Sequence, residues 1–251
     1  MTSHDPAAYG DAWADIYDDW HPAPPAGFVD FITAEISATN AGPGAVLELA
    51  AGTGRLALPL ATRGIETWAL DASTKMLDRL RAKPGAETIR VVEADMADFT
   101  LERDDFALVF VAATSLFTLL SQELQLGCFA SSARHLRSGG RFVIDCFVPD
   151  LSRFTDDTNL STRDVGDGVL RLDASAHDPV TQIVRSHHVF VRPGGTELLP
   201  VDVRYAWPAE LDLMARLAGL ELIARYASWH REPFTRYSPG HVSVYARNSR
   251  G

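Results

Sequence analysis

The segment from Val46 to Ala57 has the clearest capacity for chemistry, with the order Val-Leu-Glu-Leu-Ala-Ala-Gly-Thr-Gly-Arg-Leu-Ala. Its apolar first half is typical of a buried strand, and its small-residue second half is typical of a loop that opens a helix. Small residues let the backbone approach a nucleoside-bearing ligand, because no side chain stands in the way. Two ligand classes fit this local pattern, dinucleotides and S-adenosylmethionine.

A dinucleotide is the first alternative. Residues 52–57 match the Gly-x-Gly-x-x-Gly/Ala fingerprint, and Asp71 lies at the end of the next predicted strand, where an acid holds ribose hydroxyls. Against it, the chain has no Tyr-x-x-x-Lys pair, which one large group of nicotinamide oxidoreductases uses. Its lysines are Lys75 and Lys83, both near the second predicted helix of the alternating region.

Two further residues favour S-adenosylmethionine. Glu48 stands four residues before Gly52, where its carboxylate attracts the cationic amino group of a methionine moiety. Asp95 follows the third predicted strand, where it accepts a hydrogen bond from the amino group of adenine while Met96 packs against the base.

Four motifs in this order resemble those of the class I S-adenosylmethionine-dependent methyltransferases. They are Glu48 to Gly54, Asp71-Ala72-Ser73 with Met76, Ala94-Asp95-Met96, and Leu136-Arg137-Ser138-Gly139-Gly140. The resemblance covers residues 44–148 and extends to the last two strands by topology. The visible departure is Ala50, where the family often has glycine. The resemblance implies S-adenosylmethionine as cofactor and S-adenosylhomocysteine as product.

The resemblance also implies where the cofactor lies. Its methionine part follows the loop from Ala50 to Gly54, Asp71 takes both ribose hydroxyls, and Asp95 takes the adenine amine. The alternative for the two acids is a turn or a helix cap, which is common for Asp after a strand. The implied cofactor-binding residues are Tyr17, Glu48, Ala50, Gly52, Gly54, Asp71, Ala72, Met76, Asp95, Met96 and Val111.

Aromatic residues mark the expected methyl-transfer site. Four rings near the N-terminus recur at steps of four, four and three, which predicts one helix face; they are Tyr9, Trp13, Tyr17 and Trp20. Related small-molecule enzymes fold such a segment over the cofactor as a lid, so the resemblance implies catalytic roles for Tyr9 and Tyr17. Phe117, after the fourth predicted strand, would wall the same site. Ordinary helix packing is the alternative for these rings.

The substrate class is predicted from charge and from a missing motif. The chain has a net charge of −10, which disfavours a nucleic-acid substrate. The Asn/Asp-Pro-Pro-Tyr/Phe motif of DNA and protein amide methyltransferases is absent after the fourth predicted strand. The aromatic lid, the Phe117 region and the meander before residues 204–208 resemble the N-methyltransferases of lincosamide antibiotic biosynthesis. We therefore expect methyl transfer to the amine of a small secondary metabolite, a demethyl-lincosamide-type precursor.

Other functions stay open at this point. An amino-sugar N-methyltransferase and a small-molecule O-methyltransferase have the same motifs. A non-catalytic S-adenosylmethionine-binding regulator is the alternative from another class, and an NAD-dependent oxidoreductase is the most distant one.

The order of elements predicts an α/β fold, a Rossmann-like doubly wound, mostly parallel sheet with an antiparallel β insertion and an N-terminal helical lid. We divide the chain into a lid (1–43), a cofactor-binding core (44–148 and 207–251) and an insertion (149–206). Predicted core strands are Ala45–Leu49, Glu66–Leu70, Ile89–Glu93, Phe106–Val111 and Arg141–Phe147. Predicted helices are Phe28–Ala38, Leu56–Thr62, Ser73–Arg81, Gln122–His135 and Pro208–Ala218.

The insertion reads as a meander over Val169–Leu172, Gln182–Val191 and Leu198–Tyr205, and two more strands follow over Leu220–Ser228 and His241–Arg247. It is expected to cover the pocket or to join subunits into a homo-oligomer. Plausible pocket or interface residues are Arg185, His187, His188, Arg192 and Trp229. No metal-ligand spacing, signal peptide or membrane span is seen, so we expect a soluble cytoplasmic protein with Cys128 and Cys146 reduced.

Overall fold

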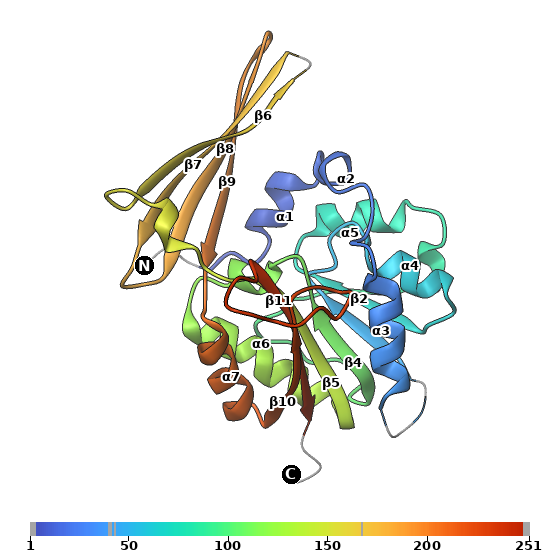
Figure 1. The fold of residues 1–251 in the computed structure, drawn as a ribbon. Helices are drawn as coiled ribbons and strands as arrows, with labels where there is room; N and C mark the ends of the chain where they lie inside the picture. Colours follow the sequence, from blue (N-terminus) through green and yellow to red (C-terminus); the bar gives the residue numbers. More distant parts are fainter. Residues whose placement is uncertain (1–3, 40–41, 43, 167, 248–251) are drawn as a thin grey trace.

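The computed structural model describes residues 4–39, 42, 44–166 and 168–247, and its centre is a seven-stranded sheet in the order β10-β11-β5-β4-β1-β2-β3 (Figure 1). The neighbours from β5 to β3 pair in parallel, whereas β10–β11 and β11–β5 pair antiparallel. The strands are β1 (Val46–Leu49), β2 (Thr67–Asp71), β3 (Arg90–Glu93), β4 (Phe106–Val111), β5 (Leu136–Phe147), β10 (Leu220–Tyr226) and β11 (Gly240–Arg247). This arrangement confirms the predicted Rossmann-like fold.

Helices cover both faces of this sheet because its central strands are apolar on both sides. Every residue of β1 and β4 is buried. In β4, Val109 and Val111 point to a core with α6 (Gln122–His135) and α7 (Pro208–Leu217). Leu108 and Phe110 point to the opposite core, with α3 (Phe28–Ser37) and the start of α4 (Ala57–Thr62). Complete burial on both faces is what a parallel sheet requires.

The strands end level with one another, which gathers their following loops at one edge. Leu49 pairs with Leu70 and with Val111, and Asp71 pairs with Glu93. The loops after β1, β2, β3 and β4 therefore meet at the carboxyl edge of the sheet, where ligands bind in open α/β folds. Helix α5 (Thr74–Arg81) begins there, and the Ser73 hydroxyl accepts the Met76 N–H as its N-cap.

One predicted boundary is wrong: the strand expected over Arg141–Phe147 already begins at Leu136, directly after α6 ends at His135. At the end of α6, the His135 ring is hydrogen-bonded on both sides: Nδ1 bonds the Ser131 carbonyl, and Nε2 accepts the Leu101 N–H at 3.0 Å. Gly139 and Gly140 therefore lie inside the strand.

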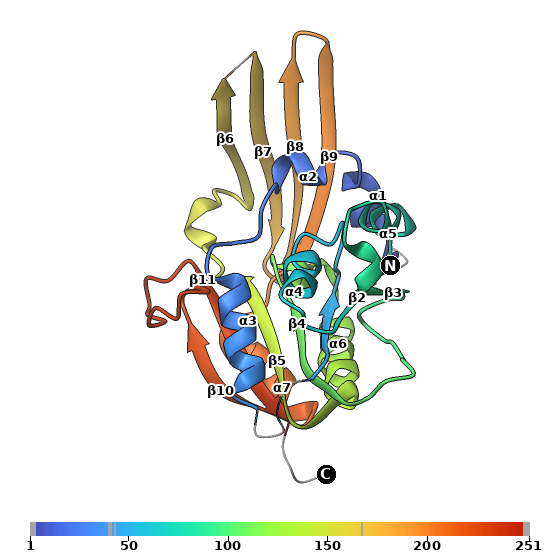
Figure 2. The same cartoon turned by 90° about the vertical axis from the view of Figure 1, so that its right-hand side faces the viewer.

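A second sheet holds four antiparallel strands in the order β6-β7-β8-β9 and extends away from the core (Figures 1 and 2). Its strands are β6 (Thr158–Gly166), β7 (Val169–Asp178), β8 (Ile183–Arg192) and β9 (Gly195–Arg204). The three predicted runs correspond to β7, β8 and β9, whereas β6 had no clear apolar pattern. The division of the chain into lid, core and insertion stays a prediction, and residues 1–3, 40, 41 and 43 of the lid lie outside the described part.

The N-terminal rings belong to two short helices, which corrects the expectation of one continuous helix. Helix α1 (Ala8–Trp13) and helix α2 (Tyr17–Trp20) are separated by Ala14–Ile16. The chain bends there because acids on this segment bind different parts of the core. The Ser73 hydroxyl donates to Asp11 at 2.7 Å, and the Thr53 hydroxyl donates to Asp18 at 2.5 Å.

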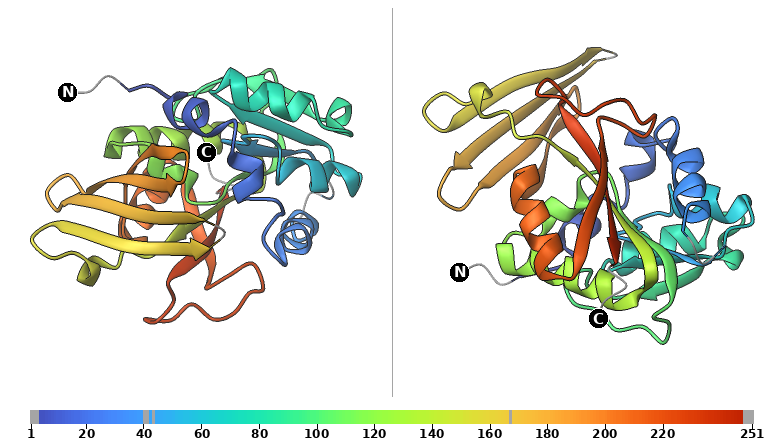
Figure 3. Two further views of the ribbon diagram at one scale, coloured as in Figure 1. Left: turned by 90° about the horizontal axis from the view of Figure 1, so that it is seen from above. Right: turned by 60° about the horizontal axis from the view of Figure 1, so that its bottom comes forward.

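The two helices lie between the second sheet and the core, as the view from above shows (Figure 3). Trp13 and Met76 are buried with Phe190 and Leu199 in one cluster, and Trp20 packs edge-on against Phe190 with ring centroids 4.8 Å apart. Within the described residues, no helix is both long and apolar enough to cross a membrane.

Candidate functional site

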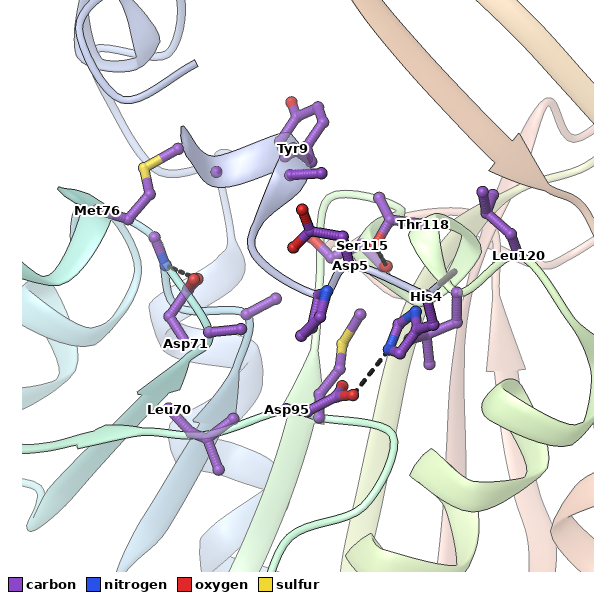
Figure 4. A pocket seen from close by; sticks show the side chains of 18 of the residues that line it. His4, Asp5, Tyr9, Leu70, Asp71, Met76, Asp95, Ser115, Thr118 and Leu120 are labelled. Atoms are coloured by element: carbon purple, nitrogen blue, oxygen red, sulfur yellow. Dashed lines mark hydrogen bonds and ion pairs between the residues drawn. The ribbon is translucent and has the colours of Figure 1, made fainter. Parts of the chain in front are cut away.

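A cavity of about 280 Å³ opens at the carboxyl edge of the central sheet, beneath α1 (Figure 4). It lies where β1, β2, β3 and β4 end, the place that the sequence motifs indicated. Nine predicted site residues line it: Tyr9, Tyr17, Ala50, Gly52, Asp71, Ala72, Met76, Asp95 and Met96. The fold therefore brings residues of three of the four motifs together with two of the N-terminal rings.

The loop after β1 is held in shape by Asp71. The Gly52 N–H donates to Asp71 Oδ2 at 2.7 Å, and the Ser73 N–H donates to Oδ1 at 2.8 Å. Both oxygens thus already accept backbone N–H groups, and a carboxylate has about four lone-pair sites in all, so Asp71 can still accept a further hydrogen bond. Burial raises the pKa of Asp71, an effect that the backbone N–H donors of Ser73 and Gly52 oppose.

Ala50, which stands where the family often has glycine, has a backbone conformation that favours glycine. Its φ is 52°, in the left-handed region that favours glycine. Alanine tolerates this conformation at a cost of about 1–2 kcal/mol. The backbone shape of the loop is therefore kept although the residue type differs.

Asp95 holds a turn and meets the N-terminal segment. Its Oδ1 accepts the Ala97 N–H at 2.8 Å, and its Oδ2 lies 2.7 Å from His4 Nε2 (Figure 4). In this arrangement the imidazole of His4 occupies the oxygen of Asp95 that does not hold the turn. His4 had no signal in the sequence, because it belongs to no motif or periodic pattern.

Glu48 lies below the loop rather than on the cavity wall. It is 3% exposed, and its Oε2 has no hydrogen-bond partner in the described structure. Burial raises the pKa of Glu48 well above its usual range, and the Arg55 guanidinium opposes that shift. A buried carboxyl with a free oxygen fits the amino group of a cofactor, because it otherwise remains unsatisfied.

Tyr9 and Tyr17 bring two phenols to the cavity. Burial raises the pKa of both, so both keep their protons at neutral pH. Tyr9 stacks on Trp13 with ring centroids 5.7 Å apart, and Tyr17 lies beside Arg55. Both residues line the cavity.

Besides Glu48, three other predicted residues are not among those that line the cavity. Phe117 is 0% exposed and packs edge-on against Phe147 in the core, so its place beside the methyl-transfer site stays a prediction. Val111 is buried in the core at the end of β4. Gly54 packs closely against Leu80, because a Cβ added at Gly54 would lie 2.8 Å from the Leu80 side chain. The wall next to Phe117 is formed instead by Ser115 and Thr118 of the short helix η2 (Ser115–Thr118), together with Leu119 and Leu120.

The second sheet contributes residues that the sequence did not single out. Pro200 and Asp202 on β9 line the cavity, together with Asp5 of the N-terminal segment. The five predicted insertion or interface residues, Arg185, His187, His188, Arg192 and Trp229, are not among the lining residues. Arg185 nevertheless contacts one of the lining residues, because its Nε lies 3.7 Å from Asp202 Oδ2.

Hydrogen bonds fasten the N-terminal helices to this site. Lys83 Nζ donates to the Thr53 carbonyl at 2.8 Å and pairs with Asp18 Oδ2 at 2.8 Å. Since Thr53 lies between the two glycines of the loop, the loop and α2 are tied to the same lysine.

The residues present fit S-adenosylmethionine. Two methionines and two acids, Met76, Met96, Asp71 and Asp95, line the cavity, which suits a ligand with an apolar base and hydrogen-bond donors, and Glu48 has an oxygen with no hydrogen-bond partner in the described structure. In the described part of the chain, no cluster of three His, Cys, Asp or Glu residues is arranged to hold a metal ion.

Comparison with known proteins gives consistent matches. A family model described as "Methyltransferase domain" matches residues 46–140. The "Cypemycin N-terminal methyltransferase" of Streptomyces sp is 30% identical over 249 residues, which are 97% of this chain and 99% of that protein.

Two solved methyltransferase structures are similar to this chain. The CcbJ methyltransferase from Streptomyces caelestis superposes with a TM-score of 0.89 at 38% identity, covering 98% of this chain and 100% of that one. The sugar N-methyltransferase KedS8 from Streptoalloteichus shares the fold, with a TM-score of 0.68 at 21% identity and 99% of each chain covered.

Proposed function

Because the chain belongs to the class I S-adenosylmethionine-dependent methyltransferases, we propose that it methylates the amine nitrogen of a small secondary metabolite. A demethyl-lincosamide-type antibiotic precursor is the leading candidate. The membership itself confirms the predicted enzyme class and cofactor, and it sets the oxidoreductase alternative aside.

One observation carries the proposal: a single cavity joins the cofactor residues to an acceptor wall. Gly52, Asp71, Thr118, Leu119 and Leu120 all line it, and the close-up shows Asp71 on one side and Thr118 and Leu120 on the other (Figure 4). Asp5 and Asp202 also line it, which gives the cavity carboxylates that attract a cationic amine. The relative named for N-terminal methylation also acts on an amine, which supports nitrogen over oxygen as the acceptor atom.

The chain's own residues prepare the amine. When bound, the cofactor supplies an electrophilic methyl group on a sulfonium, and the nitrogen must present a free lone pair in line with it. Burial among Tyr9, Leu119 and Leu120 disfavours the ammonium form and lowers the pKa of the amine. The Tyr9 and Tyr17 oxygens accept an N–H from the neutral amine and so orient its lone pair; the proton leaves to solvent.

The remaining cofactor contacts are proposed as the motifs imply. Asp71 holds the ribose, Asp95 the adenine amine in place of His4, and Met76 and Met96 flank the base. Glu48 meets the methionine ammonium. Val111 and Gly54 act through packing beneath the loop.

The β-sheet insertion is proposed to choose the acceptor, because Pro200 and Asp202 reach the cavity from β9. Its exposed apolar side chains, Leu160 (70%) and Leu198 (59%), support the further proposal of a homo-oligomer, which light scattering would test. The cytoplasm is the proposed location, in keeping with two buried free cysteines.

The test is product identification. Purified protein is incubated with methyl-labelled cofactor and, separately, with a demethyl-lincosamide, an amino sugar, a peptide with a free α-amine and a hydroxyl-bearing analogue. We expect label on the nitrogen of the lincosamide, located by fragmentation mass spectrometry. Label on oxygen would favour the O-methyltransferase alternative, and label on the amino sugar the amino-sugar alternative. Cofactor binding without any product would favour the regulator.

A further inference from the structure

A groove of about 680 Å³ lies on the four-stranded sheet and is lined by β6, β7, β8 and the segment that follows η3 (Leu151–Arg153). Arg185 and His187 of β8 line it, whereas the next residue, His188, contacts Trp13 of α1 with ring centroids 5.4 Å apart. Side chains alternate between the two faces of a strand. The groove therefore lies on the face of the sheet that is turned away from the N-terminal helices.

The groove adjoins the cofactor cavity along two rows of residues that cross the sheet. Directly opposed residues of neighbouring strands have their side chains on the same face, about 5 Å apart. Each row begins on β9 with a residue that lines the cavity, and its members on β8, β7 and β6 line the groove. The first row is Asp202, Arg185, Ala176 and Thr158, and the second is Pro200, His187, Ala174 and Leu160. A ligand in the cavity can thus extend across this face.

Two guanidinium groups face this groove, although the chain has a net charge of −10. They belong to Arg153 and Arg185, and none of the described residues that line the groove is Asp or Glu. A hollow lined by charges of one sign attracts ligands of the other sign. The fork of a guanidinium matches the two oxygens of a carboxylate, because two of its N–H groups donate in parallel.

Stability does not account for these residues. Arg185 pairs with Asp202, but their side chains are 58% and 36% exposed, and a surface pair of this kind contributes about 0–1 kcal/mol. Alanine is disfavoured in strands, where larger side chains pack better. Ala174 and Ala176 nevertheless form the middle of both rows, and their small side chains leave the space of the groove open.

The cavity itself has room for little more than the reacting end of an acceptor. Its volume of about 280 Å³ lies just below the range of about 300–1,000 Å³ that is usual for one drug-sized ligand. The cofactor alone is a ligand of that size. The rest of the acceptor must therefore lie outside the cavity, and the groove next to Asp202 provides adjoining space.

We infer that the groove is a second subsite for the acceptor and binds a carboxylate that the same molecule carries at a distance from its amine. The inference rests on the proposed function and deepens it, because it gives the acceptor a second charge. Arg185 and Arg153 bind the carboxylate, while the amine lies in the cavity near Asp202. The substrate class is thus a zwitterionic amine whose two charges are separated by one or more strand spacings of about 4.8 Å.

The experiment compares matched acceptors with the full chain. The demethyl-lincosamide, the amino sugar and the peptide of the product test are each prepared in two versions, one ending in a carboxylate and one in the isosteric, uncharged carboxamide. Initial rates of methyl transfer give kcat and KM for each version. For the acceptor that is methylated, we expect the carboxylate version to have a KM about tenfold lower and a similar kcat.

Two variants test the groove directly. Arg185→Gln removes one guanidinium and should reduce the preference for the carboxylate to less than about threefold. Ala176→Leu keeps every charge but fills the groove, so it should raise the KM of the carboxylate version. The matched control is Arg192→Gln, the same change on the same strand at a residue that is not among those lining either hollow; it should keep the preference. All three should bind S-adenosylhomocysteine with native affinity in calorimetry.

Equal KM values for the two versions with the native protein would overturn the inference, and so would a preference that Arg185→Gln leaves unchanged. If Arg185→Gln does not fold, Arg153→Gln replaces it with the same expectation. A phosphate-ended version that is preferred over the carboxylate would overturn the choice of anion. Methylation without any carboxylate preference would leave the proposed function intact, whereas the absence of product from every acceptor would refute that function and the inference with it.

Discussion

At the scale of single residues, Tyr17 lines the cavity and its hydroxyl interacts with Arg55. Tyr17→Phe keeps the ring and removes the group proposed to orient the amine. We expect kcat to fall about tenfold or more, as the loss of a hydrogen bond to a reacting group predicts, with a smaller change in the Kd of S-adenosylhomocysteine. Steady-state kinetics and calorimetry measure the two. The control is Tyr237→Phe, on a residue 82% exposed, and native turnover in Tyr17→Phe would contradict the placement.

Phe117 belongs to the packing of the core, which changes what its replacement should do. It is fully buried against Phe147. Phe117→Ala should lower the free energy of unfolding by about 3–5 kcal/mol, and Phe117→Leu by less than about 1.5 kcal/mol. Urea denaturation measures both. Leu217→Ala, on a residue 76% exposed, is the control and should change stability by less than about 0.5 kcal/mol. A Phe117→Ala protein of native stability but low kcat would restore the predicted catalytic role.

Glu48 makes cofactor binding depend on pH. In the free protein, burial raises the pKa of Glu48, so its carboxyl stays protonated at pH values at which an exposed glutamate is ionised. A bound ammonium favours the ionised form and lowers that pKa. Binding should therefore release a proton, and affinity should rise with pH between the lowered and the raised pKa. Calorimetry in buffers of different ionisation heat counts the proton, and Glu48→Gln should abolish its release. An equal binding heat in all buffers would show that Glu48 does not titrate on binding.

At the scale of elements, α1 packs closely against Ser73, the N-cap residue of α5, through Gly10. A Cβ at Gly10 would lie 2.5 Å from the Cβ of Ser73, so Gly10→Ala must push the two elements apart. We expect S-adenosylhomocysteine to bind about tenfold more weakly and proteolysis of residues 4–27 to accelerate. Gly194→Ala, where an added Cβ meets nothing within 4 Å, is the control. Unchanged affinity would mean that α1 does not close the cofactor site.

Elements with their own local signals were predictable, whereas elements shaped by distant partners were not. The pattern placed β4 and α6 at their observed bounds, because continuous burial and the Ser121 cap are local properties. The break between α1 and α2 depends on Ser73 and Thr53, which lie far along the chain. The same distinction holds in the site: loop residues followed from spacing, but His4 and Asp202 reach the cavity only through the tertiary fold.

Across the whole molecule, the second sheet supports the cofactor site through the N-terminal helices. Phe190 on β8 contacts Trp20, and the same cluster contains Trp13 and Met76, which reaches the cavity wall. Arg171 on β7 adds its guanidinium over the Trp20 ring, 4.7 Å from the centroid. Sequence spacing placed the rings together but gave no sign that their partner was the insertion.

This continuity predicts that a change on the outer sheet weakens cofactor binding. Phe190 is 0% exposed and does not line the cavity. Phe190→Ala removes the surface on which α1 and α2 rest, so we expect S-adenosylhomocysteine to bind about fivefold or more weakly and to raise the Tm by less than in the native protein. Calorimetry and thermal unfolding measure these effects. Val180→Ala, on a residue of the same sheet region that is 89% exposed, should leave both unchanged. If Phe190→Ala lowers the Tm of the free protein but binds the ligand normally, the second sheet acts on stability alone and the N-terminal helices hold the cofactor site without it.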